Sequence, residues 1–328
     1  MVKQILPLLL LLSVPALAAK PALTVYTYDS FSAEWGPGPA VKKAFEAQCG
    51  CELKYVALED GVSLLNRVRM EGKNSKADVV LGLDNNLLQA AQQTGLFAKS
   101  SVDLSKLALP GGWQDQTFIP FDYGYFAFVY DKNRLKNPPT SLKELVESPE
   151  KWRVIYEDPR TSTPGLGLLL WMQKVYGDNA PEAWQKLAQK TVTVTKGWSE
   201  AYGLFLKGEG DLVLSYTTSP AYHLIEEKKE NYAAAPFSEG HYLQVEVAAQ
   251  LASSKQPALA QQFMQFMLTP AFQHAIPTGN WMYPVIKSDL PAGYQTLSVP
   301  QTALQFSPQE VAQQRASWIS AWQRAVSR

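Results

Sequence analysis

Short β-type segments alternate with amphipathic helices along most of the chain, and this alternation constrains the fold more than any other feature. Residues 23–28 alternate β-branched and aromatic side chains, which predicts a strand, and Pro39 marks the first turn of the helix that follows. Strands are predicted again at residues 53–57 and 77–83, each followed by a helix with apolar side chains on one face. Because strands joined by crossover helices run parallel, the pattern predicts an α/β fold.

A second series of strands and helices follows an aromatic, extended segment at residues 118–130. The pattern predicts strands at 152–156, 192–195, 211–216 and 242–248, and helices at 164–176, 181–189, 198–207, 257–268, 270–275 and 308–326. Two such series predict two α/β lobes, each a mixed sheet flanked by helices, with a chain that crosses between them more than once. We assign residues 20–120 and about 245–282 to lobe 1, and about 121–244 and 283–328 to lobe 2.

The first residues have the composition of a secretory signal peptide. Lys3 supplies the positive charge, an apolar stretch extends from Ile5 to Ala19, and Ala16-Leu17-Ala18 matches a cleavage site. The apolar stretch is 15 residues long, shorter than the roughly 20 needed to cross a bilayer, and no Cys follows it to carry a lipid anchor. We therefore expect cleavage near Ala18 and an exported protein in the periplasm.

Charge and motifs exclude several classes of function. The chain has 30 basic and 30 acidic residues, and this balance argues against a nucleic-acid or membrane-surface binder. No H-E-x-x-H, G-x-S-x-G, P-loop or G-x-G-x-x-G motif occurs. Carboxylates such as Asp122 and Asp158 keep an exported hydrolase open as an alternative, although most carboxylates only face solvent. The sequence favours a binding protein over an enzyme, with no metal site.

Cys49 and Cys51, separated by Gly50, are the only cysteines. In an oxidising compartment, this spacing favours a small local disulfide loop over two free thiols or a redox site.

Two short polar segments stand where strands end and helices begin. Asp60-Gly61 follows the second predicted strand, at the edge where α/β sheets bind ligands, but an Asp before a helix is equally a common N-cap. Ser162-Thr163 precedes Pro164 and a helix, so its hydroxyls and free amides suit either an anion or helix capping.

Aromatic and hydroxyl side chains at other junctions are further candidates. Trp198 opens a helix, where a core position is the commoner role, and residues 216–219 offer four hydroxyls in a row after a strand. Tyr28, Tyr222 and Trp281 suit an aromatic box around flat rings, and each suits core packing equally well. Trp35 is a weaker candidate at the edge of a cleft.

Four separated segments resemble, in the right order, the periplasmic thiamine-binding proteins of bacterial ABC importers. They are YTYDSF at 26–31, LEDGV at 58–62, DPRTSTPG at 158–165 and GNWMYP at 279–284. The resemblance extends over almost the whole chain. It implies a two-lobed periplasmic-binding fold of type 2, with a hinge and a ligand in the cleft between the lobes. The ligands would be thiamine and its mono- and diphosphate. Delivery would be to a membrane permease driven by an ATPase, by a carrier that is a monomer without a cofactor.

The resemblance turns the open positions into ligand-binding candidates. Thiamine carries a permanent thiazolium cation and a flat aminopyrimidine, which aromatic faces and a nearby carboxylate hold well. The candidates are Tyr28, Asp60, Gly61, Ser162, Thr163, Trp198, Tyr216, Thr217, Thr218, Ser219, Tyr222 and Trp281.

Two alternative cargoes remain within the same fold. A ferric-ion carrier would use tyrosinates such as Tyr216 and Tyr222, which are close in sequence. A polyamine carrier would need several carboxylates, whereas the candidate loops supply mainly hydroxyls and one Asp.

Overall fold

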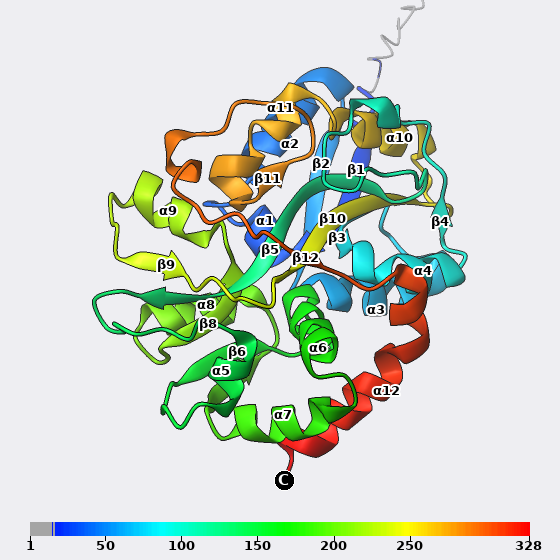
Figure 1. Ribbon diagram of the computed structural model, residues 1–328. Coiled ribbons are helices and arrows are strands. Elements are labelled where there is room, and N and C mark those ends of the chain that lie inside the picture. The colour runs from blue at the N-terminus through cyan, green and yellow to red at the C-terminus, as the bar shows by residue number, and fades with distance from the viewer. Residues whose placement is uncertain (1–14, 16) are drawn as a thin grey trace, which may run out of the picture.

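The computed structural model describes residue 15 and residues 17–328. It has two α/β lobes, one above the other in Figure 1, so the predicted fold class is confirmed. Most of the predicted signal peptide, residues 1–14 and 16, lies outside the described residues. Among the described residues, the search for a helix of membrane-spanning length and hydropathy found none.

Lobe 1 contains three parallel strands in the order β2-β1-β3. These strands are β1 (Ala22–Tyr28), β2 (Glu52–Leu58) and β3 (Val79–Asp84). The helices of this lobe are α2 (Gly38–Cys49), α3 (Gly61–Glu71), α4 (Leu88–Gln93), α10 (Pro257–Phe266) and α11 (Pro270–Gln273). All six residues of β3 are buried, because helices and neighbouring strands cover it on every side.

Lobe 2 repeats the arrangement with parallel strands in the order β8-β6-β7. They are β6 (Val154–Glu157), β7 (Thr191–Thr195) and β8 (Leu212–Tyr216). The helices are α5 (Leu142–Glu147), α6 (Thr163–Tyr176), α7 (Ala180–Ala188), α8 (Trp198–Leu206) and α9 (Ser219–Glu226). Helix α6 buries ten consecutive residues, Thr163 to Met172, and is the central helix of this lobe.

Two long strands connect the lobes. Strand β5 (Ile119–Asp131) pairs with β10 (His241–Leu251) through Tyr125 and with β8 from Phe126 onward. Strand β10 in turn pairs with β3, antiparallel. Figure 1 shows β5 and β10 running from the upper lobe towards the lower one. One continuous sheet therefore passes through both lobes, and β5 and β10 are the natural hinge.

The short elements complete the sheet edges and one wall of the interlobe region. The short strands are β4 (Phe97–Ala98), β9 (Tyr232–Ala234), β11 (Tyr283–Pro284) and β12 (Ala303–Leu304). The short helices are α1 (Asp29–Ser32), η1 (Gly72–Asn74), η2 (Asn85–Leu87), η3 (Leu104–Lys106), η4 (Gly177–Asn179), η5 (Ile276–Asn280) and η6 (Ala292–Tyr294). Helix α1 lies between β1 and α2, where the sequence analysis predicted no helix.

The C-terminal helix α12 (Pro308–Val326) packs against both lobes. Its start is fixed by a capping box between Ser307 and Glu310. It contacts α4 in lobe 1 and α7 in lobe 2, as its course in Figure 1 shows. Trp322 Nε1 donates to the Tyr156 hydroxyl at 3.1 Å, which anchors its end in lobe 2.

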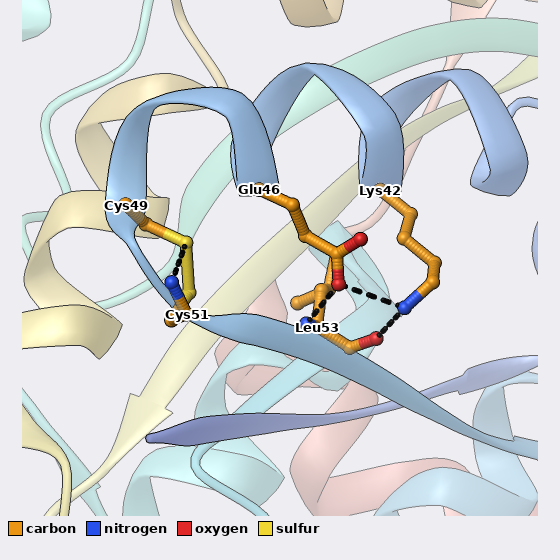
Figure 2. Close-up of a disulfide and its surroundings, with 5 residues drawn as sticks. All are labelled: Lys42, Glu46, Cys49, Cys51 and Leu53. Atoms are coloured by element: carbon orange, nitrogen blue, oxygen red, sulfur yellow. Dashed lines mark hydrogen bonds and ion pairs between the residues drawn. A yellow bond between two sulfur atoms is a disulfide. The ribbon is translucent and has the colours of Figure 1, made fainter. Parts of the chain in front are cut away.

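The favoured disulfide between Cys49 and Cys51 is present. It closes the turn between α2 and β2, where Gly50 adopts a left-handed conformation with φ of 60°. In Figure 2 the same turn is tied by Glu46, which accepts from Leu53 N and Lys42 Nζ, both at 2.8 Å. The crosslink has a local, structural place in the fold.

Candidate functional site

A cavity of about 330 Å³ lies between the two lobes. Residues at the ends of β1, β2 and β8 line it together with the first turns of α6, α8 and α9 and the segment around η5. The lining residues are Tyr28, Ser30, Trp35, Glu59, Asp60, Thr163, Pro164, Trp198, Ser199, Tyr202, Gly203, Leu206, Tyr216, Ser219, Tyr222, Glu246, Gly279, Asn280, Trp281 and Met282. A cavity of this size, with mainly apolar walls and a few polar groups, fits a small organic ligand.

Asp60 is the N-cap of α3 and joins the two lobes. Its Oδ1 accepts from Gly61 N at 2.7 Å and from Thr163 Oγ1 at 3.2 Å. Its Oδ2 accepts from Trp198 N at 3.0 Å. Thr163 and Trp198 belong to lobe 2, so this carboxylate forms these two bonds only when the lobes are together. We call Asp60, Gly61, Thr163 and Trp198 the Asp60 cluster.

Burial sets the protonation of Asp60. The side chain is 5% exposed, and burial raises its pKa from 3.8 to about 6, although three hydrogen bonds favour the ionised form. At neutral pH it is therefore a buried carboxylate whose charge a cationic ligand would compensate.

Other polar bonds hold the lobes closed over the cavity. Ser63 N at the start of α3 donates to Thr161 O at 2.9 Å, and Ser199 Oγ donates to Asp29 Oδ1 at 2.8 Å. Glycines allow the close approach: a Cβ on Gly61 would lie 2.4 Å from Thr163 Cγ2. The structure is thus the closed form, with lobe 1 and lobe 2 in direct contact at the cavity rim.

Aromatic rings form two walls of the cavity. Trp198 stacks on Tyr202, with ring centroids 5.0 Å apart and planes at 19°, and Trp198 Nε1 donates to Ser215 Oγ at 2.8 Å. On the other wall, Tyr222 meets Trp281 edge to face at 5.4 Å. Trp281 ends η5 in a left-handed conformation, with φ of 56°. Indole and phenol faces of this kind attract flat cationic rings.

Carboxyl groups form part of the cavity wall at the hinge strands. Glu246 of β10 lines the cavity and accepts from the Tyr28 hydroxyl at 3.2 Å and from Asn280 Nδ2 at 3.3 Å. Asn280 Nδ2 also donates to Asp122 Oδ2 at 2.6 Å. We call Tyr28, Asp122, Glu246 and Asn280 the acid cluster.

The charge of the cavity lining is negative. Its carboxyl groups among the described residues are those of Glu59, Asp60 and Glu246, and it includes no Lys, Arg or His. An uncompensated negative lining in a buried site favours a cation.

Comparison with known proteins gives the family. A model described as bacterial extracellular solute-binding protein matches residues 36–274. The chain belongs to the bacterial extracellular solute-binding proteins. It is 78% identical over 328 residues, all of both chains, to the thiamine-binding periplasmic protein of Escherichia coli (strain K12). It is 54% identical over 316 residues to that of Brucella suis biovar 1, covering 96% of this chain and 95% of the relative.

Solved structures agree with this assignment. A periplasmic thiamin binding protein, 78% identical, superimposes with a TM-score of 0.94 over 95% of this chain and 98% of its own. Iron-bound HitA from Pseudomonas aeruginosa shares the fold alone, at 23% identity and a TM-score of 0.76 over 93% and 99% of the two chains. These likenesses confirm the predicted family and type 2 fold, and they place the chain among carriers and not among enzymes.

Eight of the twelve predicted site residues of this solute-binding protein line the cavity. They are Tyr28, Asp60, Thr163, Trp198, Tyr216, Ser219, Tyr222 and Trp281. Trp35, the weaker candidate, lines the cavity as well. Its side chain is 55% exposed, and the centroid of its ring lies 6.4 Å from that of Trp198.

The other four predicted residues lie behind the lining. Gly61 packs on Thr163, and the buried Ser162 caps α6 by accepting from Gly165 N at 3.1 Å. Thr218 Oγ1 donates to Trp281 O, which fixes that aromatic wall. Thr217 donates its N–H to Tyr125 O at 3.0 Å and faces a different hollow, lined in part by residues 298–302. A role of these four in binding remains a prediction.

The sequence analysis of this solute-binding protein missed several lining residues. Glu246 and Asn280 are polar, and Tyr202 and Met282 add apolar surface. One pattern points to Glu246. It is the one carboxylate of β10, a strand that is buried along its whole length. Asn280 comes from η5, a segment without a periodic pattern.

Proposed function

We propose that this chain is the periplasmic thiamine-binding component of a bacterial ABC importer. The observation that carries the proposal is the cavity, which offers aromatic faces and buried carboxyls to a cation. The full-length relatives at 78% identity, from Escherichia coli and Salmonella typhimurium, are named thiamine-binding periplasmic proteins.

Each part of thiamine has a matching group in the cavity. The thiazolium ring is a cation without an acidic proton, so it cannot be held by a hydrogen bond and depends on aromatic faces and a counter-charge. Trp198, Tyr222 and Trp281 supply the faces, and Asp60 supplies a desolvated charge. The flat aminopyrimidine fits the remaining space beside Tyr28 and Tyr216.

Thiamine mono- and diphosphate belong to the proposed ligands. The first turn of α6 lines the cavity through Thr163 and Pro164, and Ser219 opens α9 beside it. The hydroxyls of Thr163 and Ser219 are neutral groups of the kind that bind a phosphate, whereas Pro164 and Pro220 have no N–H and Gly165 N is bonded to Ser162 Oγ. These groups support the esters as ligands in a cavity without basic lining residues.

The carrier would act as a monomer in the periplasm, after signal-peptide cleavage near Ala18. Closure of the lobes buries the ligand and presents the closed form to a membrane permease whose ATPase drives import. We retain residues 20–120 plus about 245–282, and about 121–244 plus 283–328, as the proposed lobes. The change of sheet partner in β5 between Tyr125 and Phe126 supports a crossing there.

A calorimetric titration with thiamine tests the function. The mature protein is unfolded and refolded first, so that ligand carried over from the cell is removed. We expect a 1:1 isotherm with a sub-micromolar Kd, tighter than about −8.2 kcal/mol. A folded protein that gives no heat at any temperature would contradict the proposal, and ferric citrate and a polyamine would then be titrated in its place.

A further inference from the structure

Two buried carboxyl groups face each other across the hinge strands. Asp122 of β5 and Glu246 of β10 are direct register partners, and they are 0% and 4% exposed. Asn280 Nδ2 donates to both carboxyl groups, to Asp122 Oδ2 at 2.6 Å and to Glu246 Oε2 at 3.3 Å, so the two groups lie side by side. Two neighbouring carboxylates in a buried site are not both ionised, and we infer that one proton lies between them.

The surrounding donors show where that proton lies. Asn280 Nδ2 donates to Asp122 Oδ2 and to Glu246 Oε2, and the Tyr28 hydroxyl donates to Glu246 Oε2. No donor among the described residues reaches Asp122 Oδ1. A proton carried by Glu246 satisfies this buried oxygen. Burial raises the pKa of Glu246 well above its ordinary value and that of Asp122 to about 6, which agrees with an acid that donates to a carboxylate.

No positive charge faces the pair. The titratable side chains near it are Tyr28 of β1, Asp84 of β3, Tyr216 of β8 and Tyr294 of η6, all acidic or neutral. No Lys, Arg or His among the described residues bonds to either carboxyl. The single negative charge of the pair is therefore without a protein counter-ion, and it lies on Asp122, directly behind Glu246 of the cavity lining.

We propose that Asp122 and Glu246 act as a proton-sharing acid pair, which supplies a second negative charge to the bound cation in addition to Asp60. This inference rests on the proposed function and refines its specificity. The pair holds one charge over a wide pH range, because its first proton is lost near neutral pH and its second is held tightly. The cavity thus selects a cation by a charge built into the hinge, before the lobes close.

A set of amide variants tests the charge of the pair. Asp122→Asn and Glu246→Gln each leave one carboxylate, and the new amide N–H replaces the shared proton. We expect each to weaken thiamine binding about two- to threefold at about pH 7.5. The double variant has the same shape and hydrogen bonds but no charge, and we expect it to bind about 30-fold more weakly or worse.

Controls separate this effect from others. Glu59→Gln removes an exposed charge from the same cavity lining. We expect it to weaken thiamine binding less than the double variant does, and its effect measures the influence of net charge alone. Thermal unfolding confirms that each variant folds. A double variant that binds no more weakly than the product of the two single effects would overturn the inference.

A measurement on the wild-type protein keeps the test valid if the double variant does not fold. Titrations at about pH 5.5 in two buffers of different ionisation enthalpy give the number of protons released per thiamine. The free ligand's own protonation is measured separately and subtracted. We expect more than one proton, because Asp60 and the acid pair both ionise on binding. One proton or fewer would mean that Asp60 alone takes part, which overturns the inference. A wild-type protein that does not bind thiamine would instead overturn the proposed function.

Discussion

The Asp60 cluster and the acid cluster place carboxyl groups on the same cavity, but their partners come from different parts of the fold. Asp60 of lobe 1 is held by Thr163 and Trp198, which belong to lobe 2. Glu246 is held by Asp122, Tyr28 and Asn280, which lie on lobe 1 and the hinge strands.

This difference separates two tasks of a closing carrier. We expect the acid cluster to keep its bonds whether the lobes are open or closed, because its members lie on β1, β10, η5 and the part of β5 that pairs with β10. The Asp60 cluster is complete only after closure, so its energy contributes to the closed, ligand-bound form. A ligand would thus first bind near the preformed negative charge of the acid cluster, and the bonds of the Asp60 cluster would form afterwards, when the lobes close.

Removing the Asp60 carboxylate should have the largest effect on binding. Asp60→Ala takes away a desolvated counter-charge and two bonds between the lobes, so we expect thiamine affinity to fall by about 3 kcal/mol or more. Calorimetry measures it. Asp29→Asn is the matched control, since Asp29 is outside the cavity lining and the change weakens only its bond to Ser199 of the other lobe. We expect a loss of about 0.5–1 kcal/mol. Equal losses in the two variants would show that Asp60 acts in closure only.

The ligand-free protein should become less stable as pH rises. The folded pKa of Asp60 is about 6 against 3.8, so the folded state binds this proton more tightly than the unfolded chain. Its stabilising contribution is full below about pH 4 and is lost as pH rises through about 6, about 3 kcal/mol in all. Asp122 and Asp84, whose pKa values burial raises to about 6 and about 7, act in the same direction.

Chemical denaturation at several pH values checks this prediction. Asp60→Asn should reduce the fall of the unfolding free energy with pH by the contribution of Asp60. The part of the fall that comes from Asp122 and Asp84 should remain. Parallel profiles for the wild type and the variant would contradict the assigned pKa. In the thiamine-bound protein the trend should weaken, because a cation favours the ionised carboxylate.

The disulfide turn serves as a reference remote from both clusters. Cys51 precedes β2 and Asp60 follows it, so the seven-residue strand separates them by about 23 Å. The double variant Cys49→Ser/Cys51→Ser should lose about 1.5 kcal/mol of unfolding free energy, since the closed loop is short. Urea unfolding measures the loss, and calorimetry should find thiamine affinity unchanged. A changed affinity would mean that strain at this turn reaches the cavity.

The smallest change tests how firmly the acid cluster is held. Tyr28→Phe removes the bond that the hydroxyl donates to Glu246 and the bond that it accepts from Asn280 Nδ2 at 2.9 Å. The direct bond from Asn280 Nδ2 to Glu246 remains. We expect a loss of about 1 kcal/mol in affinity by calorimetry, smaller than that of Asp60→Ala. A loss as large as that of Asp60→Ala would mean that the acid cluster contributes as much to thiamine affinity as the Asp60 cluster does.

Local patterns were enough to predict most elements of the fold. Alternation at residues 23–28 and 53–57 predicted β1 and β2, and the segment from Pro308 to Val326 predicted α12 with its bounds. These features depend on side-chain periodicity and capping, which act within a few residues. The helix α1 was missed, because a single turn has no period to detect.

The sequence by itself determined the α/β class, the two lobes, the crosslinked turn and, through motif resemblance, the Asp60 and Trp198 positions. Only the tertiary structure decided which groups meet: that Asp60 bonds across the lobes, that Thr217 faces away from the cavity, and that Glu246 lies beside Asp122. The physical reason is that each of these depends on strand register and lobe closure between residues more than 100 positions apart, or on the direction of one side chain at a strand end. Periodicity along the chain carries no information about either.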